Sequence, residues 1–431
     1  MQDELRRFTY SKTFIVGFGF LGISIIWPIF NQFIPLFLQA GNPQFEAQLL
    51  AEGRALPTVA GFGLAPSLAM FSITWDNLIN LLVQPWVGAR SDRTWTRFGR
   101  RKPWILLGTP IAVVGFVLLP FAPAALALAA FILITNFGMA LFRSPTVAWL
   151  GDLFLPDDRS RANGIINLMG GIGSLLAFLG GGYLFNNFGR AAPFIAGAVL
   201  MVVALSVAVW RVREPKEPPN DVGADELRSV RDNLRLVAGR ADKGGLYVLL
   251  GILFWFMAFN ALEAALSSFA VFVLGIAPGT AAIYSAAISL SFILFAWPAG
   301  VLGTSFGRRK IIIGGLIGMT LVLGLAYFLI QGVVTFIVIL VLGGLFWAMI
   351  NVNSLPLVYD FGDERHIGAF TGLYYFSSQL AAVLGPTLGG VVVDVMGDQY
   401  RWMFPFSALF MALALLVMLR VRAKPVAPVA A

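Results

Sequence analysis

Twelve long apolar runs constrain the fold of this chain more than any other feature of its sequence. Each is long enough to cross the roughly 30 Å hydrocarbon core of a membrane. They cover residues 12–38, 64–89, 103–122, 125–150, 161–185, 191–210, 246–274, 280–303, 310–330, 334–359, 367–394 and 401–420. Backbone polar groups in lipid must be satisfied within their own segment, so runs of this length predict α-helices. The sequence therefore predicts an all-α polytopic membrane protein with twelve transmembrane helices.

Basic residues gather in the segments on one side of this array. The main clusters are 90–102, 211–243 and 308–310, whereas the opposite segments hold chiefly Arg54, Arg190 and Arg401. The positive-inside rule then places both termini in the cytoplasm, and we expect a multi-pass protein of the cell inner (plasma) membrane. A net charge of +8 is also common in nucleic-acid-binding proteins. Because the charge is confined to short segments between apolar runs, it predicts membrane topology and no nucleic-acid partner.

The chain repeats itself at an offset of 208 residues. Gly99-Arg100-Arg101-Lys102 recurs as Gly307-Arg308-Arg309-Lys310, and Asp152 recurs as Asp360; 307 minus 99 and 360 minus 152 are both 208. Such a repeat predicts two pseudo-symmetric six-helix bundles of the same orientation. We expect an N-terminal bundle at 1–210, a cytoplasmic linker at 211–245 and a C-terminal bundle at 246–431.

Three charged residues lie well inside apolar runs: Asp76, Arg143 and Glu263. Charges at this depth are costly, and they usually face a partner or a wet cavity. A guanidinium that pairs with a carboxylate in one conformation and releases it in another can couple protonation to movement. These three residues are therefore the predicted proton-coupling groups. The alternative is a permanent structural ion pair.

Amide and aromatic side chains recur at helical spacing in several runs. Planar polar groups and aromatic faces are suited to sugar hydroxyls and C–H surfaces. The predicted substrate-binding residues are Asn31, Asn80, Asn136, Arg143, Asn167, Asn260, Glu263, Trp347, Asn351, Tyr375 and Gln379. For any one amide, the alternative is an ordinary hydrogen bond between helices.

The segment after the second run carries a recognisable motif. Gly88, Asp92-Arg93, Arg97 and Gly99-Arg100-Arg101 resemble the loop signature of the major facilitator superfamily, in the lengthened form of its sugar-cation symporters. Phe142-Arg143-Ser144-Pro145 is similar to the plant sucrose transporters and their relatives. The resemblance implies a major facilitator fold and makes Arg143 the group that engages sugar hydroxyls. Ile132 stands where those transporters carry an acid, so their proton site does not carry over unchanged.

The same motif predicts a cytoplasmic gate. Asp92 can accept hydrogen bonds from the start of a neighbouring helix, and the arginines can hold a carboxylate such as Asp152. The predicted gate residues are Gly88, Asp92, Arg93, Arg97, Arg100, Arg101 and Asp152. Thr304 and Ser305 replace the acidic and basic residues in the second repeat, so we expect an asymmetric gate. The alternative is that the charges only set topology.

The sequence contains no motif typical of an enzyme active site or a metal site. There is no cysteine, the single histidine is His366, and no Walker loop is present. The chain is therefore predicted to be no enzyme, to have no cofactor or metal, and to use solute or ion gradients.

Together these features predict a monomeric importer of a disaccharide or related glycoside, of the sucrose and maltose class, by proton symport through alternating access. The melibiose group pairs two acids on its second helix to hold sodium, and Asn80 takes the second place here. A proton is therefore preferred to sodium. The alternatives are a sodium-coupled or uncoupled sugar carrier, an exporter of a pigment precursor or drug, and a transport-inactive sugar sensor.

Overall fold

The computed structural model describes residues 8–154, 156–214, 235, 239, 243–360 and 367–421. His366 and most of the expected 211–245 linker lie outside these residues. The chain forms two compact units. The first comprises Met1–Leu64, Ser72–Val222 and Ala270–Ala286, and the second Ala65–Phe71, Gly223–Phe269 and Ala287–Ala431. The six-helix halves at 1–210 and 246–431 stay a prediction.

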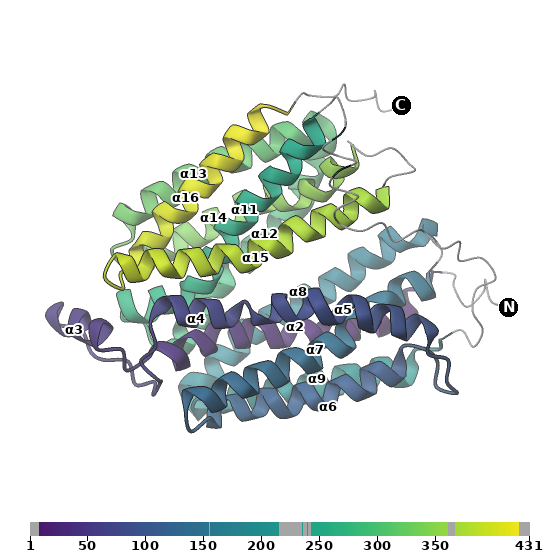
Figure 1. Cartoon of the computed structure of the whole chain (residues 1–431), viewed down its shortest axis with the longest axis horizontal. Helices are drawn as coiled ribbons and strands as arrows, with labels where there is room; N and C mark the ends of the chain where they lie inside the picture. The colour runs from purple at the N-terminus through teal and green to yellow at the C-terminus, as the bar shows by residue number, and fades with distance from the viewer. Residues whose placement is uncertain are drawn as a thin grey trace. The chain divides into compact units, whose positions relative to one another are not determined.

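The first unit is a bundle of long apolar helices (Figure 1). Its helices are α2 (Tyr10–Gln39), α3 (Pro43–Ala51), α5 (Trp75–Arg93), α6 (Lys102–Leu118), η1 (Leu119–Phe121), α7 (Ala125–Leu153), α8 (Pro156–Phe188) and α9 (Ala192–Arg211). Helix α2 packs on α8 and α9, α6 packs on α7 and α9, and α5 packs on α7. Phe33, Phe116 and Phe194 are buried between these helices.

The second unit repeats this packing. Its helices are most of α4 (Pro66–Ile73), α11 (Gly244–Ser268), α13 (Arg308–Leu329), α14 (Val333–Tyr359), α15 (Ile367–Val395), η4 (Tyr400–Trp402), α16 (Met403–Leu419) and most of α12 (Pro278–Phe306). The π-helix η2 (Phe269–Val273) extends α11, and all of η2 except Phe269 belongs to the first unit. Helix α11 packs on α15 and α16, and α13 packs on α14 and α16. Helices at repeat-related positions thus pack on equivalent neighbours, as the 208-residue repeat predicts.

Eleven helices in the described part of the chain are long and apolar enough to span a membrane. The second expected run, 64–89, is built from two helices, α4 and α5, which meet at Thr74. Helix α3 was not expected from the sequence. It is short, and it is held by Phe45, whose ring stacks on that of Phe272 with centroids 4.8 Å apart.

Helices α6 and α7 approach so closely that glycine is required at their contact. A Cβ atom on Gly138 would lie 2.3 Å from the backbone nitrogen of Ala112. We expect Gly138→Ala to lower the free energy of unfolding by roughly 1–3 kcal/mol, because the backbone cannot yield as a side chain would. Thermal unfolding in detergent measures this. Gly180→Ala is the control, since no atom lies within 4 Å of a Cβ there; equal losses in both variants would contradict the packing argument.

Candidate functional site: an ion-pair cluster and a buried polar site

The loop after α5 brings two arginines onto one carboxylate. Asp152, near the end of α7, accepts hydrogen bonds from Arg101 Nε at 2.8 Å and Arg100 Nε at 3.1 Å. Arg100 Nη2 also bonds Asp152, and Arg101 Nη2 pairs with Asp92. Arg101 Nη1 donates to Ser91 Oγ at 2.5 Å. Asp92, Arg100, Arg101 and Asp152 form what we call the ion-pair cluster, which ties the loop to α7.

The cluster keeps Arg101 charged although its side chain is buried. Burial alone would lower the pKa of Arg101, but the hydrogen bonds and charge of Asp152, together with Asp92, outweigh it and raise the pKa above the ordinary value. Charge-assisted bonds to a planar guanidinium are among the strongest hydrogen bonds in proteins. Arg101 is therefore a fixed cation at the centre of the cluster.

Glu214, which was not identified from the sequence, binds the backbone of the same loop. Its carboxylate accepts hydrogen bonds from the backbone N–H groups of Arg100 at 2.6 Å, Arg101 at 2.8 Å and Lys102 at 3.0 Å. It also accepts one from Trp149 Nε1 at 2.9 Å. These N–H groups stand at the start of α6, where an anion is favourable. At the start of α6, the anion position is thus occupied by Glu214.

Gly99 makes room for this carboxylate. Its backbone φ is +110°, which residues with a side chain rarely adopt, and a Cβ atom at this position would lie 2.3 Å from Glu214 Oε2. The glycine of the loop motif therefore serves the contact with Glu214. Glu214 lies three residues beyond α9, in a Pro-rich segment that we expected to be a plain linker. An isolated glutamate there has no spacing pattern that would have identified it.

Three predicted gate residues lie outside the ion-pair cluster. Gly88 faces α7, with a Cβ position 3.4 Å from Ser144 Oγ. Arg93 and Arg97 are exposed, and the Arg97 guanidinium lies 4.7 Å from the centre of the Phe98 ring. In the second unit, Arg308 pairs with Asp360. These two residues occupy the repeat positions of Arg100 and Asp152.

A second polar site lies within the membrane-spanning part of the first unit. Asp76, near the start of α5, accepts a hydrogen bond from Asn77 Nδ2 at 2.9 Å and interacts electrostatically with Arg143 on α7. Both charged side chains are half-buried. Two of the three charges predicted to act together therefore interact electrostatically. Glu263 belongs to the other unit.

Two buried amides lie on the same pair of helices. Asn80 is 4% exposed and Asn136 is 1% exposed. Helices α5 and α7 run in the same direction, since each is antiparallel to α6, and Gly88 on α5 faces Ser144 on α7. Asn80 and Asn136 lie eight residues before these two positions, which puts them at the same level of the bundle.

Neither amide is satisfied. Among the described residues, the side-chain nitrogen and oxygen of both Asn80 and Asn136 have no hydrogen-bond partner. An unsatisfied buried polar group costs roughly 1–3 kcal/mol. Such groups in a folded protein point to an unseen water or ligand. We call Asn80 and Asn136 the amide pair.

The other predicted residues of the first unit have ordinary environments. Asn31 is half-buried on α2. Asn167 is exposed on α8 and donates to Asn163 Oδ1 at 2.8 Å.

The predicted residues of the second unit lie on α11, α14 and α15. Asn260 donates to the backbone oxygen of Phe256 at 2.7 Å, and Glu263 is exposed one turn later. The buried Trp347 stacks on Phe259 with ring centroids 3.9 Å apart, so that face is not open to a sugar. The remaining predicted residues are Asn351 and Gln379, which are half-buried, and Tyr375, which is exposed.

Comparison with known families gives this arrangement a context. The sequence model of the Major Facilitator Superfamily matches residues 13–296 and, in a second match, residues 272–431. The chain belongs to the major facilitator superfamily. A crystal structure of the nucleoside transporter NupG superimposes on this superfamily member with a TM-score of 0.71 at 12% identity, covering 94% of this chain and 99% of that one. The major facilitator fold predicted from the sequence is confirmed.

Curated relatives match part of the chain. Proton-associated sugar transporter A of Homo sapiens is 29% identical over 191 residues, which cover 38% of this chain and 25% of the relative. A sucrose transport protein of Arabidopsis thaliana is 27% identical over 147 residues, covering 29% of this chain and 25% of the relative. The match thus spans about a quarter of the length of these relatives. The resemblance to the sucrose transporter branch rests on these shared regions.

Proposed function

We propose that this superfamily member is a secondary active transporter that imports a disaccharide or related glycoside with a proton, by alternating access. The observation that carries the proposal is the amide pair, whose polar atoms have no hydrogen-bond partner among the described residues. The same two helices carry Asp76 and Arg143, which interact electrostatically. An amide offers one donor group and one acceptor, the complement of a sugar hydroxyl. A neutral polyhydroxyl solute can therefore satisfy the pair without introducing charge.

The charged neighbours of the pair supply a means of coupling. A proton on Asp76 would remove its attraction to Arg143 and free the guanidinium for substrate hydroxyls. Glu263 is the proposed acid of the second unit. The names of the relatives, a proton-associated sugar transporter and a sucrose transport protein, agree with this reading.

Uptake of radiolabelled sucrose and maltose into proteoliposomes tests the proposal. We expect accumulation when the outside is acidic and only equilibration without a pH gradient. If accumulation followed a sodium gradient instead, the coupling ion would be sodium and not a proton. Binding without any uptake would contradict transport and favour a sensor.

The amide pair itself can be tested by replacement with a residue of similar size. We expect Asn136→Leu to raise the sugar concentration for half-maximal uptake about tenfold, the loss of one good hydrogen bond. Thermal stability should be unchanged or higher, because an unsatisfied buried group is removed. Concentration-dependent uptake and thermal unfolding provide both readouts.

Asn353→Leu is the matched control. Asn353 is also buried, but its amide donates to the backbone oxygens of Ala299 at 3.1 Å and Met349 at 3.0 Å. This variant should lose stability and keep its sugar affinity. If Asn136→Leu behaved in the same way, Asn136 would be a structural residue and no part of a sugar site.

A further inference from the structure

A pocket of about 470 Å³ opens beside the end of α5 that leads into the basic loop. It is lined by Trp86, Ala89, Arg90, Arg93 and Thr94. Residues 86, 90 and 93 recur at intervals of four and three, so they share one face of the helix. Asp92 and Ser91 point elsewhere, toward Arg101. The pocket is therefore separate from the ion-pair cluster.

In the described part of the chain, no carboxylate neutralises the two arginines of the pocket. Arg90 and Arg93 are exposed, and no carboxylate in the described part of the chain lies within salt-bridge distance of either. The Arg90 guanidinium lies 5.6 Å from the centre of the Trp86 ring. Two cations three residues apart repel one another, so an anion between them would be stabilised.

The walls of the pocket are held in place from α6. Trp104 Nε1 donates to Thr94 Oγ1 at 3.1 Å, and Thr94 Oγ1 donates to the backbone oxygen of Arg90 at 2.8 Å. The Trp104 ring meets the Trp86 ring edge to face, with centroids 5.8 Å apart. The site is thus preorganised before a ligand arrives.

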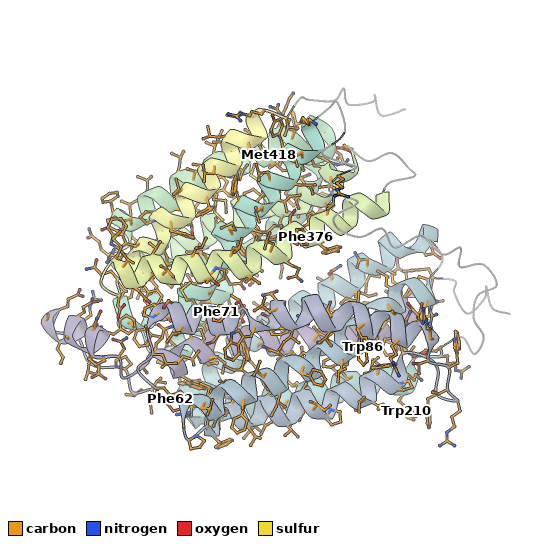
Figure 2. The ribbon with its side chains drawn as sticks, viewed as in Figure 1. Phe62, Phe71, Trp86, Trp210, Phe376 and Met418 are labelled. Atoms are coloured by element: carbon orange, nitrogen blue, oxygen red, sulfur yellow. The ribbon has the colours of Figure 1, made fainter. Side chains whose placement is uncertain are left out.

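The pocket has one apolar side and one cationic side. Trp86, labelled in Figure 2, is 53% exposed. Exposed tryptophans mark the interface between membrane and water, and anionic lipid headgroups are found on the side where basic loops gather. An amphiphile with a phosphate headgroup fits both sides, whereas a free anion would use only the arginines.

We propose that this pocket binds the phosphate of an anionic phospholipid, with the guanidinium groups of Arg90 and Arg93 on the phosphate and the Trp86 ring against the adjoining glycerol and acyl chain. The site does not depend on which solute is carried. It gives this end of α5, and the loop that leads to the ion-pair cluster, a fixed contact with the lipid leaflet.

Titration of the purified protein in detergent with phosphatidylglycerol tests the proposal, with the shift in unfolding temperature as the readout. We expect phosphatidylglycerol to stabilise the wild type and phosphatidylcholine to have little effect. The double variant Arg90→Gln/Arg93→Gln should weaken the apparent affinity for phosphatidylglycerol by about 20-fold, since each arginine near an anionic surface contributes several-fold. Both side chains are exposed, so the variant should fold.

Arg211→Gln is the matched control. Arg211 is an exposed arginine that also lies over an exposed tryptophan, Trp210, with 5.1 Å between the guanidinium carbon and the ring centre. A second exposed arginine, Arg213, follows two residues later, but neither arginine lines the pocket. We therefore expect the affinity of this variant for phosphatidylglycerol to match that of the wild type. An equal loss in the control would mean that only overall charge matters and would overturn the proposal.

Two further results would overturn it. Stabilisation by glycerol 1-phosphate equal to that by phosphatidylglycerol would assign the pocket to free phosphate compounds. Equal stabilisation by phosphatidylcholine would show that headgroup charge is not recognised.

Discussion

Replacing Arg143 with Ala should reduce sugar uptake in proteoliposomes by at least about 100-fold while the protein still inserts. The change removes the cation that interacts electrostatically with Asp76 and the guanidinium proposed to bind sugar hydroxyls. A hydrogen bond to a charged group contributes about 1.5–3 kcal/mol, so the loss of two such bonds to the substrate accounts for an effect of this size. Asp76 would keep the hydrogen bond from Asn77 Nδ2 but lose the nearby cation. Initial uptake rates, normalised to the protein recovered in the vesicles, provide the measurement.

Two companion variants separate the role of Arg143 in transport from a role in folding. Arg143→Lys keeps the charge but loses the planar fork, so we expect partial uptake at best. The pair Asp76→Asn with Arg143→Ala removes both charges and should recover thermal stability without recovering uptake driven by a pH gradient. Normal uptake in Arg143→Ala would remove this residue from the proposed mechanism.

Replacing Glu214 with Ala should destabilise the first unit and disturb the ion-pair cluster. The change leaves three backbone N–H groups and the Trp149 indole without their acceptor. A hydrogen bond to a charged group contributes about 1.5–3 kcal/mol, and the four share one carboxylate, so we expect a loss of about 3 kcal/mol in the free energy of unfolding. Thermal unfolding in detergent measures it.

Glu52→Ala is the control for Glu214→Ala. Glu52 is an exposed glutamate that forms an ion pair with Arg54, at 3.3 Å. Exposed pairs contribute at most about 1 kcal/mol, so this variant should unfold close to the wild-type temperature. The unfolding temperature of Glu214→Gln should lie between those of Glu214→Ala and Glu52→Ala, because the glutamine amide oxygen can still accept hydrogen bonds. An unchanged unfolding temperature in Glu214→Ala would show that water replaces the carboxylate at no cost.

Much of the fold could be predicted because it depends on local features of the sequence. The apolar runs mark the spans, and the recurrence of Gly99-Arg100-Arg101-Lys102 after 208 residues marks the repeat. The break at Thr74 between α4 and α5 was missed, since both helices lie in one apolar run. Helix α3 was missed because its stability depends on a contact between Phe45 and Phe272, which are far apart in sequence.

The candidate sites were predicted only in part. The sequence brought Arg100, Arg101 and Asp152 into one hypothesis, and the three side chains meet in the structure. It gave no sign of Glu214, whose partners are mainly backbone groups. It grouped Arg93 with the gate residues, whereas Arg93 lines the pocket with Trp86 and Arg90.

The sequence by itself determined the membrane class, the repeat and the superfamily, because hydrophobicity, spacing and motif are properties of a chain read in order. Only the tertiary structure decided which carboxylate reaches the start of α6 and which buried amides have no partner. Those outcomes depend on the register between helices. A shift of one residue along α5 turns a side chain by about 100°, so the packing alone determines whether Asn80 is buried or faces outward.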